Sequence, residues 1–184
     1  MLELYDWLRK DYIVNIYSGR LTREQLKNIN PDLIVSYNYK YIITKDVIDY
    51  MDGNIINLHS SYLPWNKGAN PNFWSFVEDT PKGVTIHQID KGLDTGKILY
   101  QKECHFDIEN ETFASTYDKL NQTMIALFKA HRDEIRDKKY QLQEQKGQGS
   151  YHTVKELEIL RQEVPFEWTD NIGAYLRKLQ LLEK

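Results

Sequence analysis

Hydrophobic and polar positions alternate in short runs through the first hundred residues, and five of these runs predict β-strands. Each run is rich in β-branched or aromatic residues and is bounded by Asn, Asp, Gly or Pro. The predicted strands are residues 12–17, 32–39, 54–59, 83–89 and 97–103. The segments between them predict short helices over 22–29, 44–51 and 70–79, the last capped by Asn70. The alternation of strands and helices predicts an α/β fold, with a Rossmann-like, mostly parallel sheet flanked by helices.

The second half of the chain follows a helical period. From Glu111 to about Lys139, apolar residues recur at three- and four-residue steps, which predicts one long amphipathic helix that covers the sheet and is capped by Asn110. Residues 141–150 are polar and glycine-containing, so we expect an exposed loop there. Two short helical patterns follow, and their apolar side chains must pack on this chain or on a second copy. We therefore expect a catalytic core over 1–140 and a small helical appendage over 141–184.

Composition narrows the class of protein. The chain has 184 residues with 41% hydrophobic residues, enough for one core, and a net charge of −3. Its densest basic stretch, residues 129–139, is interleaved with acids, which disfavours a nucleic-acid partner. No apolar run reaches the roughly 20 residues of a membrane helix. A single cysteine and an N-terminus unlike a secretory signal indicate a cytoplasmic protein without a membrane partner.

Three polar residues suggest a reactive site. Asn57 and His59 end a predicted strand and, two residues apart, point to the same side. Asp94 lies in the loop after the strand expected next to it, so its carboxylate could reach His59. In parallel sheets ligands bind beyond the carboxyl ends of the strands, where we expect this group to lie. An amide and an imidazole that stabilise an oxyanion, with no obvious side-chain nucleophile, suggest acyl transfer between two bound substrates.

The motifs around these residues resemble a known family. "NLHSSYLPWNKGANPNFWSF" followed by "GVTIHQIDKGLDTGKIL" is similar to the formyltransferases that use N10-formyltetrahydrofolate. That family carries an N-x-H-x-S-x-L-P motif and, roughly 35 residues later, a D-x-G loop; here His59 and Asp94 are 94 − 59 = 35 positions apart. The resemblance covers residues 12–105 and implies catalytic roles for Asn57, His59 and Asp94. Serine hydrolysis is disfavoured because neither serine of the motif stands in a G-x-S-x-G elbow.

The resemblance also implies a mechanism. An amine of the acceptor attacks the formyl carbon, and the oxyanion is held by the Asn57 amide and by His59 as an imidazolium. Asp94 supports the charged His59 and relays or accepts the amine proton, either directly or through water. No metal is implied, because the histidines lack metal-ligand spacing with acids or cysteine.

Two sets of binding residues follow from the resemblance. The folate side is formed by the loop before the Asn-x-His strand and by the Asp loop, with candidate residues Tyr39, Tyr41, Ile42, His87, Asp90 and Leu93. The acceptor side has the candidates Trp65, Lys67, Asn70 and Tyr151, with the lysine expected on a phosphate and the tryptophan on a base or sugar.

The sequence of the motif is most similar to that of the sugar N-formyltransferase branch of the family. The segment "GQGSYHTVKELE" (147–158) also resembles a segment found after the core in that branch. The implied acceptor is a nucleotide-linked amino sugar of the dTDP-4-amino-4,6-dideoxyglucose type, used in lipopolysaccharide or O-antigen biosynthesis. The alternatives are methionyl-tRNA or glycinamide ribonucleotide as the acceptor, hydrolysis of formyltetrahydrofolate, and a non-catalytic folate-binding relative.

The start of the chain departs from the family pattern. Relatives open with a strand, a Gly-rich turn and a helix before the segment that matches residues 12–17, and this chain begins at the helix before that segment. We therefore expect an N-terminally shortened sheet, whose exposed edge a homodimer or the C-terminal segment would cover.

Overall fold

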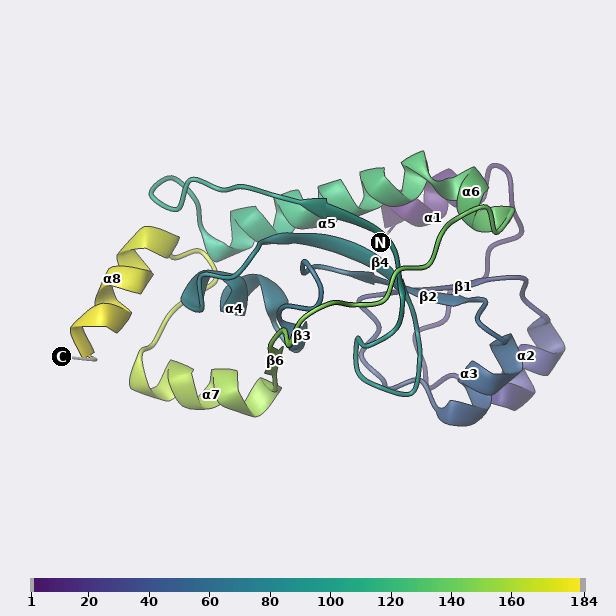
Figure 1. The fold of residues 1–184 in the computed structure, drawn as a ribbon, viewed down its shortest axis with the longest axis horizontal. Helices are drawn as coiled ribbons and strands as arrows, with labels where there is room; N and C mark the ends of the chain where they lie inside the picture. Colours follow the sequence, from purple (N-terminus) through teal and green to yellow (C-terminus); the bar gives the residue numbers. More distant parts are fainter. Residues whose placement is uncertain (1, 183–184) are drawn as a thin grey trace.

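A mixed sheet of four strands forms the centre of the protein, for which a computed structural model describes residues 2–182 (Figure 1). The strand order is β1-β2-β4-β5, with bounds β1 (Ile34–Tyr37), β2 (Ile55–His59), β4 (Gly83–Gln88) and β5 (Ile98–Glu103). The predicted α/β class with flanking helices is confirmed. The prediction of a mostly parallel sheet is wrong, because β1 and β2 pair in parallel whereas β2–β4 and β4–β5 are antiparallel.

The lengths of the connections explain why β4 and β5 are antiparallel to their neighbours. Residues 89–97 join β4 to β5 directly, and a parallel pair needs a crossover of about a dozen residues or more. The helix between β2 and β4, α4 (Pro71–Val77), packs against α5 and the C-terminal helix α8. The chain therefore enters β4 in the opposite direction to β2.

Residues 12–17 do not form the strand that the sequence predicts. They run in an extended but unpaired path between α1 (Leu2–Leu8) and α2 (Arg23–Ile29). Ile13 is 98% exposed and Ile16 is 54% exposed. Within residues 2–182 the sheet ends at β1, so no strand pairs with this segment, and β-branched composition alone does not make a strand.

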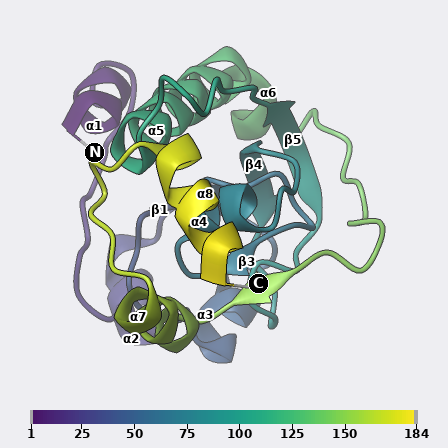
Figure 2. The same cartoon turned by 90° about the vertical axis from the view of Figure 1, so that its left-hand side faces the viewer.

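One face of the sheet is apolar and covered by helices. Ile56 and Leu58 of β2 point to this face, together with Val84 and Ile86 of β4, and they pack against α5 (Phe113–Ala130) and α1. Both views show α5 lying along the sheet with α1 beside it (Figures 1 and 2). This is the covering helix that the sequence predicts.

The other face is divided in two. Ile55, at the start of β2, packs with Leu26 of α2 and with Val47 and Met51 of α3 (Lys45–Met51). Asn57 and His59 point to the same side of β2 because side chains alternate along a strand. The end of β2 is thus polar on this face, and loops rather than helices cover it.

The C-terminal segment packs on its own chain. Its helices, α7 (Val154–Glu163) and α8 (Ile172–Leu182), contribute to an aromatic cluster around the fully buried Phe73 of α4. Figure 2 shows α8 in front of α4. This settles where the apolar residues of these two helices pack, while the boundary at 140/141 stays a prediction and residues 183–184 lie outside the described part.

The long helix begins later and ends earlier than predicted. α5 starts at Phe113 with Thr112 as its N-cap, and a break at His131 separates it from α6 (Arg132–Arg136). The Thr112 hydroxyl accepts from the Ser115 N–H at 3.0 Å, and the Ser115 hydroxyl accepts from the Thr112 N–H at 2.9 Å. Asn110, the predicted cap, instead donates to Asp107 at 2.7 Å.

We expect Thr112→Ala to lower the free energy of unfolding by about 1 kcal/mol, because it removes the side-chain partner of a helix-terminal N–H. Urea denaturation measures the change. Asn110→Ala, which leaves the cap intact, is the control, and an equal or larger loss in that variant contradicts the assignment of Thr112.

Two further short strands lie beside the sheet. β3 (Lys67–Gly68) and β6 (Tyr151–His152) pair in parallel and tie the loop after β2 to the C-terminal segment. Among the helices of residues 2–182, none combines the length and the apolar content that crossing a bilayer requires.

Candidate functional site

Asn57, His59 and Asp94 come together as the sequence predicts. The Asn57 Nδ2 atom lies 3.3 Å from Asp94 Oδ1, and His59 Nε2 lies 3.8 Å from Asp94 Oδ2. The side chains of His59 and Asp94 are only 9% and 10% exposed. The three groups therefore form one compact, largely desolvated polar cluster.

The cluster lies on one face of the sheet, at the end of β2, of which His59 is the last residue. His87 of β4 pairs directly with Asn57 of β2, so both point to the same face. Because β4 is antiparallel to β2, its following loop begins beside Ile55, the first residue of β2, where the Ile89 N–H donates to the Ile55 carbonyl at 3.0 Å. The loop then brings Asp94 back over Asn57.

Asp94 is held as a carboxylate by its neighbours. The Gly68 N–H donates to Asp94 Oδ2 at 2.9 Å, and Asp94 itself adopts a positive φ of 53°. Burial alone would raise the pKa of Asp94, but His59, His87 and the Gly68 N–H together hold that pKa well below its usual value. Asp94 is therefore ionised throughout the physiological pH range.

His59 is a neutral imidazole at pH 7. Burial lowers the pKa of His59 below its usual value, an effect that the Asp94 carboxylate opposes and that His87 reinforces. Its Nε2 atom faces two acceptors, the Asn66 carbonyl oxygen at 3.4 Å and Asp94 Oδ2, so this nitrogen carries the proton. The expected imidazolium is thus replaced by a neutral N–H donor.

His87 lies beside Asn57 and Asp94 and is only 1% exposed. Its Nδ1 atom lies 2.7 Å from the Gln88 carbonyl oxygen and its Nε2 atom lies 3.3 Å from Asn57 Nδ2. The same Nε2 atom lies 3.5 Å from Asp94 Oδ1. His87 therefore borders both the Asn57 amide and the Asp94 carboxylate, and the Asn57 amide is in turn held by its contact with Asp94.

The lowered pKa of His59 predicts a pH dependence of stability. Below about pH 6.5 the unfolded chain binds a proton at this imidazole that the folded chain does not bind, so the free energy of unfolding falls as the pH falls. The slope from this one group is at most about 1.4 kcal/mol per pH unit. In urea denaturation at pH 7.5 and 5.5, His59→Gln should reduce the difference between the two pH values. The exposed His105→Gln is the control, and an equal reduction in both variants contradicts the assignment.

The predicted folate residues lie on two adjacent loops. Ile43 and Ile89 pack on the same apolar cluster, so the loop after β1 and the loop after β4 are side by side. Next to them, Ile42 is 82% exposed and Leu93 is 46% exposed. These apolar side chains are available to a ligand, whereas Asp90 accepts from the Gly92 N–H and the Thr95 hydroxyl and so shapes the loop that carries Asp94.

The two tyrosines of the first loop have local partners. The Tyr39 hydroxyl donates to the Gly19 carbonyl at 2.6 Å and accepts from the Leu21 N–H at 2.9 Å, which ties it to the N-terminal segment. Tyr41 packs edge-on against Tyr39, and the side chains of Arg20 and Lys40 lie over its ring. Direct roles of both tyrosines in folate binding stay predictions.

Two of the predicted acceptor residues are neighbours. Lys67 of β3 pairs with Tyr151 of β6, and Tyr151 is 51% exposed. Trp65 is half-buried in the loop before β3, and Asn70 begins α4 in a left-handed conformation without a side-chain capping bond. Because Gly68 bonds to Asp94, the Lys67–Tyr151 pair lies directly beside the Asn57–His59–Asp94 cluster.

Sequence reasoning missed several residues that shape the site. Asn66 is fully buried, and its carbonyl oxygen faces His59. Gln145 donates to the Asp94 backbone from a segment predicted to be only an exposed loop. A glutamine in a polar stretch carries no pattern that would identify it. In the part of the chain that the structure describes, no group of three His, Cys, Asp or Glu side chains is arranged to hold a metal ion.

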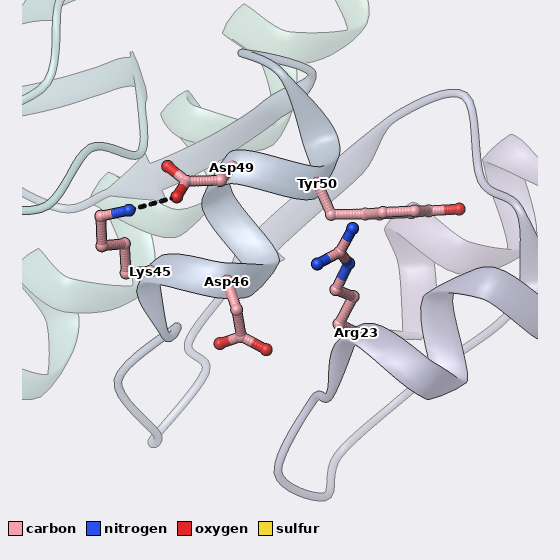
Figure 3. Close-up of a pocket in the computed structure, with 5 residues that line it drawn as sticks. All are labelled: Arg23, Lys45, Asp46, Asp49 and Tyr50. Carbon is pink, nitrogen blue, oxygen red and sulfur yellow. Dashed lines mark hydrogen bonds and ion pairs between the residues drawn. The ribbon is translucent and has the colours of Figure 1, made fainter.

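A separate pocket of about 400 Å³ opens between the start of α2 and one side of α3 (Figure 3). It is lined by Arg23, Lys45, Asp46, Asp49 and Tyr50, and it contains none of the cluster residues. Lys45 and Asp49 pair with each other at 2.5 Å. Its charges are largely exposed and mutually compensated, so the chemistry of the protein is better sought at the Asn57–His59–Asp94 cluster.

Comparisons with known proteins show the family of this chain. The model of the formyl transferase family matches residues 17–130, which include the whole cluster. The crystal structure of the formyltransferase PseJ from Anoxybacillus kamchatkensis, in complex with UDP-4,6-dideoxy-4-formamido-L-AltNAc and tetrahydrofolate, is 42% identical to this chain. The match covers 96% of this chain and 93% of that one, with a TM-score of 0.89.

Curated relatives include proteins with different acceptors. The dTDP-4-amino-4,6-dideoxyglucose formyltransferase of Mycobacterium bovis is 30% identical over 151 residues, which are 82% of this chain and 63% of the relative. The methionyl-tRNA formyltransferase of Syntrophus aciditrophicus is 42% identical over 99 residues, 53% of this chain and 31% of the relative. This chain therefore spans less than two thirds of the length of these relatives.

Proposed function

This chain belongs to the formyl transferase family, and we propose that it transfers the formyl group of N10-formyltetrahydrofolate to the amine of a nucleotide-linked 4-amino-4,6-dideoxy sugar. The observation that carries the proposal is the convergence of Asn57 and His59 on the buried carboxylate of Asp94. Two neutral donors and one fixed anion suit an acyl transfer in which negative charge develops on oxygen and an amine loses a proton.

Asn57 and His59 stabilise the oxyanion. In the geometry described above, both donors are engaged inside the protein: Asn57 with Asp94 and His87, and His59 with the Asn66 carbonyl. The formyl oxygen competes for these hydrogens as it becomes negatively charged. A neutral imidazole N–H is sufficient for this role, and the burial that lowers the His59 pKa also strengthens the hydrogen bond to an anion.

Asp94 accepts a proton from the attacking amine and later donates it to the leaving group. Its ionised carboxylate attracts an N–H of the attacking amine and accepts the proton as the new C–N bond forms. When the C–N10 bond breaks, the same proton passes to N10, so the products are a formamide and tetrahydrofolate and no net proton is released. The Gly68 N–H keeps the Asp94 carboxylate in place during this exchange.

Exposed apolar side chains support a folate site beside the cluster. Ile42 and Leu93 emerge from adjacent loops and present apolar surface of the kind that packs on a flat ring. The relative PseJ was crystallised with tetrahydrofolate, which supports the same co-substrate here.

The acceptor is inferred from the relatives and from the neighbours of Asp94. PseJ, which was crystallised with a UDP-linked 4-formamido sugar, is 42% identical to this chain, and the match covers 96% of it. The match to the methionyl-tRNA formyltransferase covers only 53% of this chain. We therefore favour a UDP-linked 4-amino-4,6-dideoxy sugar over the dTDP-linked one. The pairing of Lys67 with Tyr151 beside Asp94 supports contacts of these two side chains with the acceptor.

The pathway, the cellular location and the oligomeric state are also proposals. The product of the reaction would serve surface-polysaccharide biosynthesis in the cytoplasm, and the exposed edge of β1 with the unpaired segment 12–17 supports a homodimer.

A panel of acceptors tests the proposal. The protein is incubated with N10-formyltetrahydrofolate and one of four additions: the UDP-linked 4-amino sugar, its dTDP-linked counterpart, methionyl-tRNA, or buffer. Tetrahydrofolate formation is followed in each case. We expect turnover only with the amino sugars and faster turnover with the UDP form. Turnover in buffer alone indicates a hydrolase, turnover with tRNA indicates the other acceptor class, and folate binding without turnover indicates a non-catalytic relative.

A further inference from the structure

One segment bonds to both loops that carry the catalytic cluster. Residues 143–150, here called the strap, run from α6 towards β6 and cross the middle of the molecule in Figure 1. At one end Gln143 exchanges two backbone hydrogen bonds with Ile98, at 2.8 and 2.9 Å. At the other end Ser150 bonds to the loop after β2. The strap lies outside residues 17–130, which the family model matches.

The strap holds the backbone of Asp94 through one side chain. Gln145 Nε2 donates to the Asp94 carbonyl at 2.8 Å and to the Gly96 carbonyl at 2.9 Å. Asp94 has a positive φ, a conformation that non-glycine residues adopt at some cost and only where surrounding contacts maintain it. Both hydrogens of the Gln145 amide are thus used to fix the loop from which the carboxylate projects.

The strap holds the backbone near His59 in the same way. The Ser150 hydroxyl accepts from the Asn66 N–H at 2.9 Å and donates to Asn66 Oδ1 at 3.2 Å. Asn66 also has a positive φ, of 56°, and its carbonyl oxygen is the group 3.4 Å from His59 Nε2. Gly149 adopts a positive φ next to Pro64, where a Cβ would collide with the Pro64 carbonyl.

We propose that Gln145 and Ser150 are positioning residues that set the placement of Asp94 relative to His59. This inference rests on the proposed function for its catalytic consequence. The two loops meet at few other bonds, chiefly that between Gly68 and Asp94, so the strap acts as a common support. Groups that act on one reacting centre must be held closely, since a displacement of about 1 Å can cost roughly 100-fold in rate.

The kinetic test uses Gln145→Ala. We expect kcat to fall by about 10- to 100-fold while KM for N10-formyltetrahydrofolate changes by less than about threefold. Gln145 bonds to the backbone at Asp94 and Gly96, whereas Ile42, the more exposed of the apolar folate candidates, lies on the loop after β1. Gln145→Glu, which keeps the shape but lacks the donor, should behave like the alanine variant. Ser150→Ala should also lower kcat, whereas Ser150→Thr, which keeps the hydroxyl, should have a kcat close to that of the wild type. Gln148→Ala, an exposed position of the same strap, is the matched control.

A second measurement does not depend on activity. The Gly68 N–H donates to the Asp94 carboxylate, so its hydrogen exchange, read by NMR, reports whether that carboxylate stays in place. Gln145→Ala should accelerate Gly68 exchange at least about tenfold. Exchange at the Ala69 N–H, which donates to the His152 carbonyl at 2.9 Å, should stay within twofold.

The outcomes separate this inference from the proposed function. Unchanged Gly68 exchange in Gln145→Ala overturns the positioning role, whatever the enzyme does. Accelerated exchange with an unchanged kcat also overturns it, because the support would then have no catalytic consequence. If the wild-type protein shows no turnover with any acceptor, the proposed function fails, and selective acceleration at Gly68 still supports the placement of Asp94 by the strap.

Discussion

Asp94→Asn is expected to lower kcat for formyl transfer by roughly 1,000-fold with little change in the melting temperature. The asparagine keeps the shape of the side chain but cannot accept a proton from the attacking amine, and general-base groups typically contribute 10²–10⁴-fold. Asp94 is held in the cluster by the Gly68 N–H and by Asn57, so its carboxylate is fixed beside His59. Steady-state kinetics with saturating amino sugar and folate measures the loss.

The companion variants sharpen this prediction. Asn57→Ala and His59→Ala should each cost about 10²–10³-fold in kcat, because each removes one donor to the oxyanion. Asp79→Asn, at a surface carboxylate that is 97% exposed, should leave kcat unchanged. A kcat for Asp94→Asn above one third of the wild-type value contradicts the assigned role.

Phe73→Ala is expected to have the largest effect on stability, a loss of about 3–5 kcal/mol in the free energy of unfolding. Phe73 is fully buried and packs against the rings of Phe113 and Phe166, whose centroids lie 5.0 and 4.7 Å away. It therefore joins α4, α5 and the C-terminal segment in one core, and its removal leaves a cavity that all three line.

Urea denaturation followed by tryptophan fluorescence measures this loss. The control is Ile159→Ala on α7, where the side chain is 47% exposed and a change of no more than about 0.5 kcal/mol is expected. Similar losses in the two variants contradict the idea that Phe73 is the centre of this packing.

The sequence was most informative where local rules act alone. The helix predicted from residue 22 is present as α2, because the threonine before this helical pattern meets its capping partner, the Gln25 N–H, within one turn. Asn57 and His59 share a face because spacing along a strand determines it. Asp94 was placed near His59 by the rule that consecutive strands are neighbours, and that rule holds whichever way β4 runs.

The failures concern long-range partners. The direction of β4 depends on where α4 packs, and its aromatic residues face helices more than 75 positions later in the chain. Residues 12–17 have strand composition but lack a neighbouring strand. Gln145 and Ser150 belong to a polar stretch without periodicity, and their importance comes only from bonds to loops roughly 50 and 84 positions away.

The protonation state of His59 also could not be predicted from the sequence. A strand-end histidine next to an aspartate suggests an imidazolium, since a nearby carboxylate raises the pKa of an imidazole. His59 is nevertheless only 8% exposed, and this desolvation has the larger effect on its pKa. Only the tertiary structure shows that desolvation outweighs the carboxylate at this position.

The central claim, transfer of a formyl group to a sugar amine at Asp94, is tested most directly by following the formyl carbon itself. The protein is incubated with N10-[13C]formyltetrahydrofolate and the UDP-linked 4-amino-4,6-dideoxy sugar, and the product is analysed by 13C NMR. We predict that the label appears in a formamide on the sugar amine, one for each tetrahydrofolate formed, and that Asp94→Asn suppresses this signal. Label recovered as free formate, or a formamide signal of equal rate in Asp94→Asn, would contradict the account.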